Sequence, residues 1–168
     1  TFDDPDVAGS VWSGTFHSVC LRILRKYGER LGYREGFSIY DTDDKKRLIT
    51  GCMKELLIDE KRLAVKAVAN AISIAKDELK TPDDIDVNQD PRSRDIVNIY
   101  RLYQQKLMEY NAVDFDDIIM MTVRLLQDEV DVREYYQNKF KFVLVDEYQD
   151  TNYAQFVLTK ILSDKYRN

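Results

Sequence analysis

Hydrophobic residues recur along most of this chain at intervals of three and four, which is the spacing of an amphipathic helix. The stripes predict helices over residues 16–31, 42–57, 63–79, 95–110, 114–126, 132–138 and 153–166. Asp41 or Thr42 and Asp114 suit N-caps, while Gly32 and Pro82 suit the ends of helices. The pattern therefore predicts a mainly α-helical chain with one long polar loop over residues 82–94.

Two segments have the character of strands instead. Residues 11–15 form a plausible short strand, and residues 142–145 form an apolar run that suits a strand buried on both faces. They lie at opposite ends of the helical block, which predicts one parallel sheet with that block inserted between its strands. Residues 1–9 are expected to form a loop, and residues 37–40 a short extended piece. Because two strands do not make a stable sheet, the chain is expected to be a piece of a larger protein.

Acidic residues follow the second predicted strand directly. Asp146 and Glu147 end the apolar run, and Asp150 comes three residues later. Open α/β sheets bind ligands at the carboxyl ends of their strands, and Mg²⁺ is a cation that one or two such carboxylates can hold together with phosphate. The alternative is a strand that runs into a helix N-terminus. There Asp150, Thr151 or Asn152 would cap the helix, and the two acids before them would only be solvated.

Composition narrows the class of protein. The chain has 168 residues, 44% hydrophobic and 33% charged, so it can bury a core. A net charge of -5 argues against a general polyanion-binding surface but leaves a local basic patch open. One such candidate is the basic face of the first predicted helix, which either is solvated or faces phosphates. Its cations are Arg22, Arg25, Lys26 and Arg30. A second candidate is the tyrosine stripe of residues 96–110, which favours core packing over base stacking.

Several chemistries are excluded. Cys20 and Cys52 lie in apolar helical patterns and are predicted to be reduced core residues, and a single histidine argues against a zinc site. No apolar run approaches the length of a membrane span and no leader peptide is evident, so a cytoplasmic location is expected. Gly9 and Gly14 have the spacing of a phosphate-binding loop, but the lysine is missing and the residues between them are too bulky.

Three motifs carry a resemblance to a known family. Thr15-Phe-His-Ser18 resembles the Thr-Phe-His-Ser motif of the superfamily 1A DNA helicases, the UvrD/Rep/PcrA group. Asp146-Glu-Tyr-Gln-Asp150 is similar to their motif II, the Asp-Glu-x-Gln-Asp form of Walker B, and Asp114-Phe-Asp-Asp117 matches the Phe-Asp-Asp element between the two. The motifs occur in the family's order and approximate spacing over nearly all the chain, and the chain looks most like the PcrA-type enzymes.

The resemblance implies a fold. Residues 18–138 would be the helical domain 1B, inserted into the RecA-like α/β ATPase core 1A. Residues 1–17 and 139–168 would be strand and helix pieces of that core. The expected fold class is thus mainly α, a helical insertion domain flanked by parts of an ATPase core.

The resemblance also implies a function, which is ATP hydrolysis that drives 3′-to-5′ translocation on single-stranded DNA and duplex unwinding, in DNA repair or replication. Asp146 would hold the Mg²⁺ of Mg-ATP, Glu147 would orient the attacking water, and Gln149 and Asp150 would support the site. Thr15, Phe16 and His17 would lie on the DNA path, although Phe16 also begins the apolar stripe and could be core. A strand-end Asp-Glu pair and an aromatic pair at a helix start suit these roles physically.

Other parts of the family pattern are missing. They are the P-loop, the upstream DNA-binding motif, the Gln-rich motif III and the second RecA-like domain with its arginine finger. The chain alone is therefore expected to be inactive and to need the rest of 1A together with domains 2A and 2B. Two alternatives remain open: an autonomous helical DNA- or partner-binding module without ATPase activity, and a Mg²⁺-dependent nuclease built on Asp146, Glu147 and Asp150. Salt-dependent oligonucleotide binding by the chain alone would support the module.

Overall fold

The computed structural model describes residues 11–88 and 90–167, and it is predominantly helical, as predicted. The helices are α2 (Phe16–Tyr27), α3 (Thr42–Glu55), α4 (Val65–Asp77), α5 (Pro91–Glu109), α6 (Phe115–Asp128), α7 (Val130–Lys139) and α8 (Tyr153–Ser163). Short 3₁₀ turns are η1 (Gly28–Leu31), η2 (Pro82–Asp84) and η3 (Tyr148–Asp150), and the strands are β1 (Ser38–Tyr40) and β2 (Ala112–Asp114). The loop predicted for residues 1–9 lies outside the described residues.

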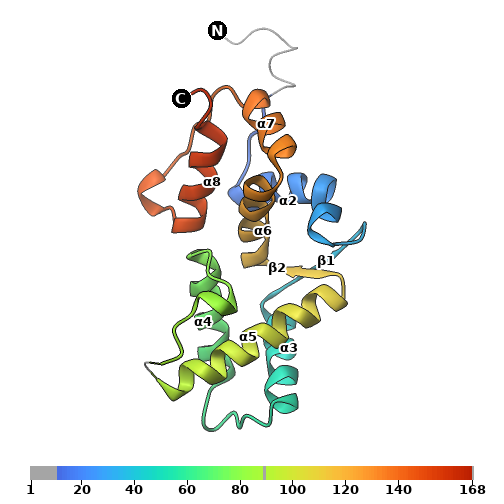
Figure 1. The fold of residues 1–168 in the computed structure, drawn as a ribbon, viewed down its shortest axis with the longest axis vertical. Helices are drawn as coiled ribbons and strands as arrows, with labels where there is room; N and C mark the ends of the chain where they lie inside the picture. Colours follow the sequence, from blue (N-terminus) through green and yellow to red (C-terminus); the bar gives the residue numbers. More distant parts are fainter. Residues whose placement is uncertain (1–10, 89, 168) are drawn as a thin grey trace.

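The helices pack as two lobes, which are stacked along the long axis of the molecule (Figure 1). The α6 lobe contains α2, α6, α7 and α8 around one core cluster, with Ile23, Ile118 and Leu158 among its buried residues. The α5 lobe contains α3, α4 and α5 around a second cluster, which includes Ile72 and Tyr103. Tyr100 and Tyr103 of the predicted tyrosine stripe therefore pack in a core, whereas Tyr110 at its end is 54% exposed. The proposed boundaries of an insertion domain at residues 18 and 138 stay a prediction.

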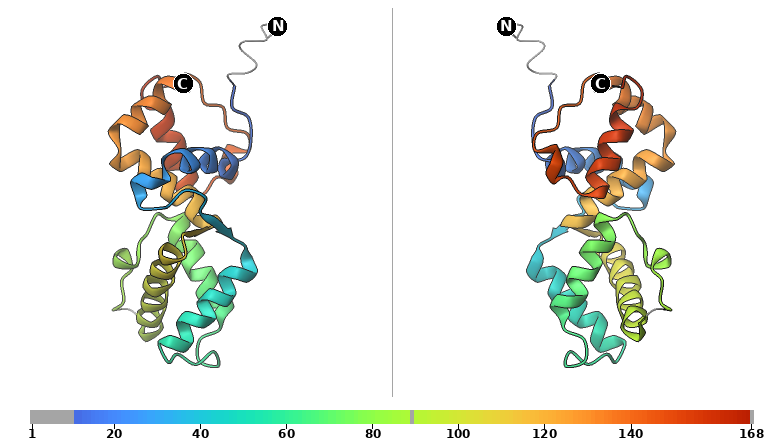
Figure 2. Two further views of the ribbon diagram at one scale, coloured as in Figure 1. Left: turned by 90° about the vertical axis from the view of Figure 1, so that its right-hand side faces the viewer. Right: turned by 90° about the vertical axis from the view of Figure 1, so that its left-hand side faces the viewer.

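A short parallel pair of strands lies where the lobes meet, as two views of the ribbon show (Figure 2). Ser38, Ile39 and Tyr40 of β1 pair with residues 112–114 of β2. The extended piece over residues 37–40 was predicted, whereas its partner strand was not. The chain passes through β1 into the α5 lobe and returns through β2 to the α6 lobe.

The two strands predicted from sequence do not form among the described residues. Residues 11–15 and 142–145 are assigned no strand, so the prediction that they share one parallel sheet is wrong here. Burial on both faces is wrong as well, because Phe142 is 76% and Leu144 is 96% exposed. The physical reason is that an extended segment becomes a strand only by hydrogen bonding to a neighbour, and the described residues supply none to this segment.

Most predicted helix ends agree with the structure to within a few residues, but α5 begins at Pro91, inside the loop predicted for residues 82–94. Asp41 caps α3 by accepting hydrogen bonds from the backbone of Asp43 and Asp44, each at 2.8 Å. Gly32, after η1, has a φ of 91°, a left-handed conformation that glycine adopts readily. Helix α8 ends at Ser163 rather than at residue 166.

Both cysteines are buried and free, as predicted. Burial raises the pKa of the Cys20 thiol to about 12 and that of Cys52 to about 11, so neither is a reactive thiolate. Within the part of the chain that the structure describes, no helix combines the length and the apolar character needed to cross a bilayer.

Candidate functional site

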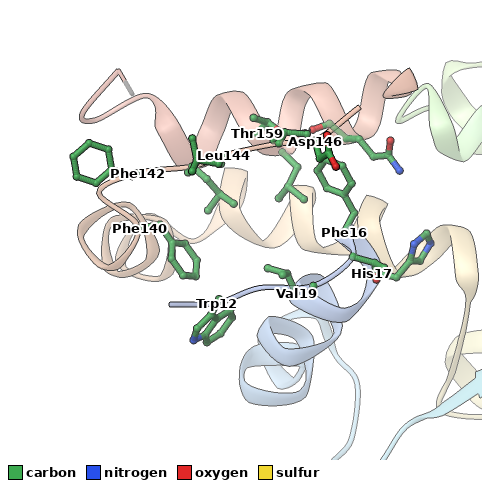
Figure 3. Close-up of a pocket in the computed structure, with 16 residues that line it drawn as sticks. Trp12, Phe16, His17, Val19, Phe140, Phe142, Leu144, Asp146 and Thr159 are labelled. Atoms are coloured by element: carbon green, nitrogen blue, oxygen red, sulfur yellow. The ribbon is translucent and has the colours of Figure 1, made fainter. Parts of the chain in front are cut away.

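A cavity of about 440 Å³ lies between the start of α2, the extended segment before η3, and α8 (Figure 3). Thr15, Phe16 and His17 line it from one side and Asp146 from another. The structure thus brings the first motif, at residues 15–18, and the start of the last motif, at Asp146, to the same cavity. In Figure 3 the Phe16 ring points toward the segment that carries Asp146, while the His17 ring projects away from it.

The start of α2 fixes how the first of these motifs is presented. Thr15 is the N-cap: its Oγ1 accepts a hydrogen bond from the backbone N–H of Ser18 at 3.2 Å. The Ser18 hydroxyl in turn donates to the Thr15 carbonyl oxygen at 2.8 Å. Thr15 therefore stabilises the N-terminus of α2, in addition to its predicted DNA contact. Phe16 and His17 are each half-buried at the first turn of the helix.

His17 has an aromatic neighbour that the sequence did not indicate. Its ring centroid lies 5.5 Å from that of Phe115, with the planes tilted by 60°. Phe115 belongs to the Asp114-Phe-Asp-Asp117 element and is 54% exposed. Sequence reasoning assigned the acids of this element to capping but missed the ring. Only the packing of α6 against α2 places Phe115 beside His17, so no local spacing could have revealed it.

The acidic residues form a tight turn at the edge of the cavity. The backbone N–H of Glu147 donates to Asp146 Oδ1 at 2.9 Å, and the Gln149 amide donates to the Glu147 carboxylate. Glu147 has φ 49° and ψ 41°, a left-handed conformation that costs a residue with a side chain about 1–3 kcal/mol. Asp146, Glu147 and Gln149 are exposed, as is Asp150. Of these four side chains only Asp146 lines the cavity.

The helix that follows is capped by a different residue. Asn152 Oδ1 accepts from the backbone N–H of Gln155 at 2.9 Å, and the Gln155 side chain accepts from the Asn152 N–H at 3.2 Å. The capping alternative is therefore correct for Asn152, and α8 needs neither Asp146 nor Glu147 for its N-terminus. The prediction that Asp146 and Glu147 hold Mg²⁺ together with phosphate is therefore still open.

The donor set limits which metal could bind. Among residues 11–88 and 90–167, no three carboxylate, histidine or cysteine side chains are placed to hold a metal ion together. A cage made only of protein ligands is thus unsupported among these residues, and the nuclease alternative stays untested. Mg²⁺ that arrives with a nucleotide needs only one or two carboxylates, because phosphate oxygens and water complete its coordination. Asp146 fits that requirement.

The basic face of α2 is occupied by contacts within the chain. Arg30 pairs with Glu129 and Asp131, and Arg25 donates to the Phe37 carbonyl oxygen at 2.6 Å. The other two cations, Arg22 and Lys26, lie over the rings of Trp12 and Tyr135. These contacts support packing of α2 within its own lobe, but all four cations are exposed, and the phosphate-facing alternative stays a prediction.

Comparison with known proteins decides the family. A family model described as the UvrD/REP helicase N-terminal domain matches residues 4–168. The chain belongs to this family. It is 44% identical over 159 residues to the ATP-dependent DNA helicase PcrA of Staphylococcus epidermidis, which covers 94% of this chain. It is 44% identical over 164 residues to the PcrA of Staphylococcus aureus strain Mu50, which covers 97%.

Membership of the UvrD/REP family confirms the resemblance based on the three motifs. The match extends over the cavity, the acidic turn and the junction between the lobes, because it runs from residue 4 to residue 168. The chain spans 22% of the length of each of these PcrA relatives. The activity of a whole helicase is therefore a matter for proposal.

Proposed function

We propose that this chain is a segment of an ATP-dependent DNA helicase that translocates 3′ to 5′ on single-stranded DNA and unwinds duplexes. The observation that carries the proposal is the 44% identity to PcrA helicases over 94–97% of the chain. The segment would act together with the remaining parts of 1A, 2A and 2B, and ATP and Mg²⁺ would be its cofactors.

The acidic turn is the proposed contribution to ATP hydrolysis. Phosphoryl transfer depends mainly on positioning and on neutralising charge, and bound Mg²⁺ supplies much of that neutralisation. Asp146 would hold the ion from the cavity edge. Glu147 would orient the attacking water and accept hydrogen bonding from it. Gln149 supports this assignment because its amide binds the Glu147 carboxylate and restricts its orientation.

The start of α2 is the proposed contribution to DNA binding. Thr15 is exposed and Phe16 and His17 are half-buried at the start of α2, and the ring of Phe115, which is 54% exposed, adds apolar surface beside His17. Aromatic rings bind single strands without sequence preference, because every base has a face that can stack. Such tolerance is what a translocating enzyme requires.

The proposal is tested by Glu147→Gln in the full-length helicase. Loss of the carboxylate should lower ATP turnover by about 10²–10⁴-fold, as expected for removal of a general base. Affinity for a non-hydrolysable ATP analogue should stay close to that of the wild type. Glu35→Gln, at an exposed position in the turn before β1, is the matched control and should leave turnover unchanged. Near-wild-type turnover in Glu147→Gln would overturn the proposal.

A further inference from the structure

The C-terminal end of α4, in the α5 lobe, makes polar contacts with the α6 lobe (Figures 1 and 2). Its last two residues each bind the N-terminal end of a different helix. Lys76 Nζ lies 2.8 Å from carboxylate oxygens of both Asp114 and Asp117 at the start of α6. Asp77 Oδ1 accepts a hydrogen bond from Asn152 Nδ2, 2.9 Å away, at the start of α8.

The position of Asp77 is electrostatically unfavourable by itself. A carboxylate at the C-terminal end of a helix faces the negative end of the helix dipole. Asp77 is also half-buried, which adds a cost of desolvation. Asp116 adds a like charge nearby, and Lys45 and His17 compensate only in part, so the pKa of Asp77 stays above its usual value. The Asn152 amide supplies a hydrogen-bond donor to this carboxylate from the other lobe.

Both the oxygen and the nitrogen of the Asn152 side-chain amide form hydrogen bonds. Its oxygen accepts from the backbone N–H of Gln155 at 2.9 Å, so its nitrogen must be the end that faces Asp77. Aspartate caps helices as well as asparagine does, but at this position it would set a second carboxylate against Asp77. The contact therefore requires an amide here beyond the need for a cap.

This contact lies immediately after the acidic turn. The backbone N–H of Asp150 donates to the Glu147 carbonyl oxygen at 2.9 Å, and that of Thr151 donates to the Tyr148 carbonyl oxygen at 3.2 Å. Asn152 is the next residue. Its attachment to α4 thus fixes the far end of the turn that carries Glu147.

We propose that Asp77 is a positioning residue that, through Asn152, holds the acidic turn in register with the α5 lobe. A displacement of the α5 lobe would then move Glu147, and a displacement of the acidic turn would move the end of α4. The effect on catalysis rests on the proposed function, because it requires Glu147 to act in ATP hydrolysis. The anchoring of the turn does not.

A swap of the two side chains tests the anchor in this chain. The readout is amide hydrogen exchange of residues 147–155 at neutral pH. Asn152→Asp should speed exchange about tenfold or more, because two carboxylates then face each other while the cap is kept. Asp77→Asn should have little effect, since the new amide can present its oxygen to Asn152. The double substitution should restore slow exchange, because the new amide at position 77 can donate to the new carboxylate at position 152.

The same variants in the full-length helicase test the effect on turnover. Asn152→Asp should lower kcat about tenfold with little change in KM for ATP, and the double substitution should recover most of the loss. Asp43→Asn, an exposed substitution in the first turn of α3, is the control for loss of one carboxylate.

Three results would overturn the proposal. They are unchanged exchange in Asn152→Asp, failure of the double substitution to restore exchange, and restored exchange without recovery of kcat. A failure of the proposed function looks different. In that case Glu147→Gln keeps its turnover, and the exchange data still decide whether Asp77 anchors the turn.

Discussion

At the scale of single residues, the least expected feature is a charged group with no access to solvent. Asp117 is fully buried and contacts Lys76 Nζ, the Gln104 amide at 2.9 Å and the backbone N–H of Asp114 at 3.0 Å. Burial and, after it, the charge of Asp114 raise the pKa of Asp117 to about 6. Burial opposes ionisation of Asp114 too, but Lys76 and Lys45 outweigh it and hold the pKa of Asp114 well below its usual range.

The raised pKa of Asp117 predicts a pH dependence of stability. Between about pH 4 and pH 6 the folded chain binds more protons at this site than the unfolded chain does, so the free energy of unfolding should fall as pH rises. Asp117→Asn should remove this part of the slope. Urea unfolding of both proteins at about pH 4.5, 5.5 and 6.5 measures the difference between their pH slopes. The pKa of Asp77 is raised as well, but its contribution is the same in both proteins and cancels in this difference. Parallel slopes for the two proteins would contradict the prediction.

Sequence reasoning found these acids but not their environment. Asp114 was predicted as an N-cap, and its Oδ1 accepts from the backbone N–H of Asp117 at 2.8 Å. The ion pairs with Lys76 could not be predicted, because Lys76 lies 38 residues earlier along the chain and meets Asp114 only through tertiary packing. The same limit applies to Phe115 beside His17 and to Asp77 beside Asn152.

At the scale of elements, helices and strands were predicted with unequal success, for a physical reason. A helix satisfies its backbone hydrogen bonds internally, so one apolar stripe such as that of α6 is enough to place it. A strand needs a partner elsewhere in the sequence. The apolar run of residues 142–145 has none among the described residues, whereas the inconspicuous residues 112–114 gain one in β1.

The contact between α4 and α6 gives a prediction at this scale. Lys76→Met should destabilise the chain by about 3–5 kcal/mol, because it leaves the Asp117 carboxylate buried without a cation and leaves Asp114 with only Lys45, whose Nζ lies 3.7 Å away. Urea unfolding followed by circular dichroism measures the change. Lys80→Met is the matched control: this side chain is 50% exposed, and its loss should change stability by less than about 0.5 kcal/mol. Equal effects of the two substitutions would show that the buried pairs contribute little.

At the scale of the whole molecule, the α6 lobe leaves large apolar side chains uncovered. Residues 142–145 all line the cavity, and Val143 and Val145 are half-buried there, whereas Phe142 and Leu144 are among the most exposed apolar residues. Contiguous exposed apolar surface promotes association with other proteins or with further copies of the chain.

Leu144→Lys should therefore change behaviour in solution but not the fold. Stability should stay within about 0.5 kcal/mol of wild type, because the Leu144 side chain is almost wholly in solvent. Self-association, followed by sedimentation velocity over a range of concentrations, should decrease. Leu158→Lys, at a buried position in α8, is the contrasting variant and should unfold the chain. A large loss of stability in Leu144→Lys would show that this segment is packed in solution.

The pairing of β1 with β2 bears on how such proteins can diversify. The chain leaves the α6 lobe at Ser38–Tyr40 and returns at Ala112–Asp114, and these two points are hydrogen-bonded neighbours. The segment between the two strands therefore starts and ends at the same place, so its length does not affect the distance between its ends. Segments with adjacent ends tolerate insertion, exchange and replacement far better than segments that connect distant points. The α5 lobe can therefore change in length at positions away from the C-terminal end of α4, where Lys76 must still meet Asp114 and Asp117 of the α6 lobe.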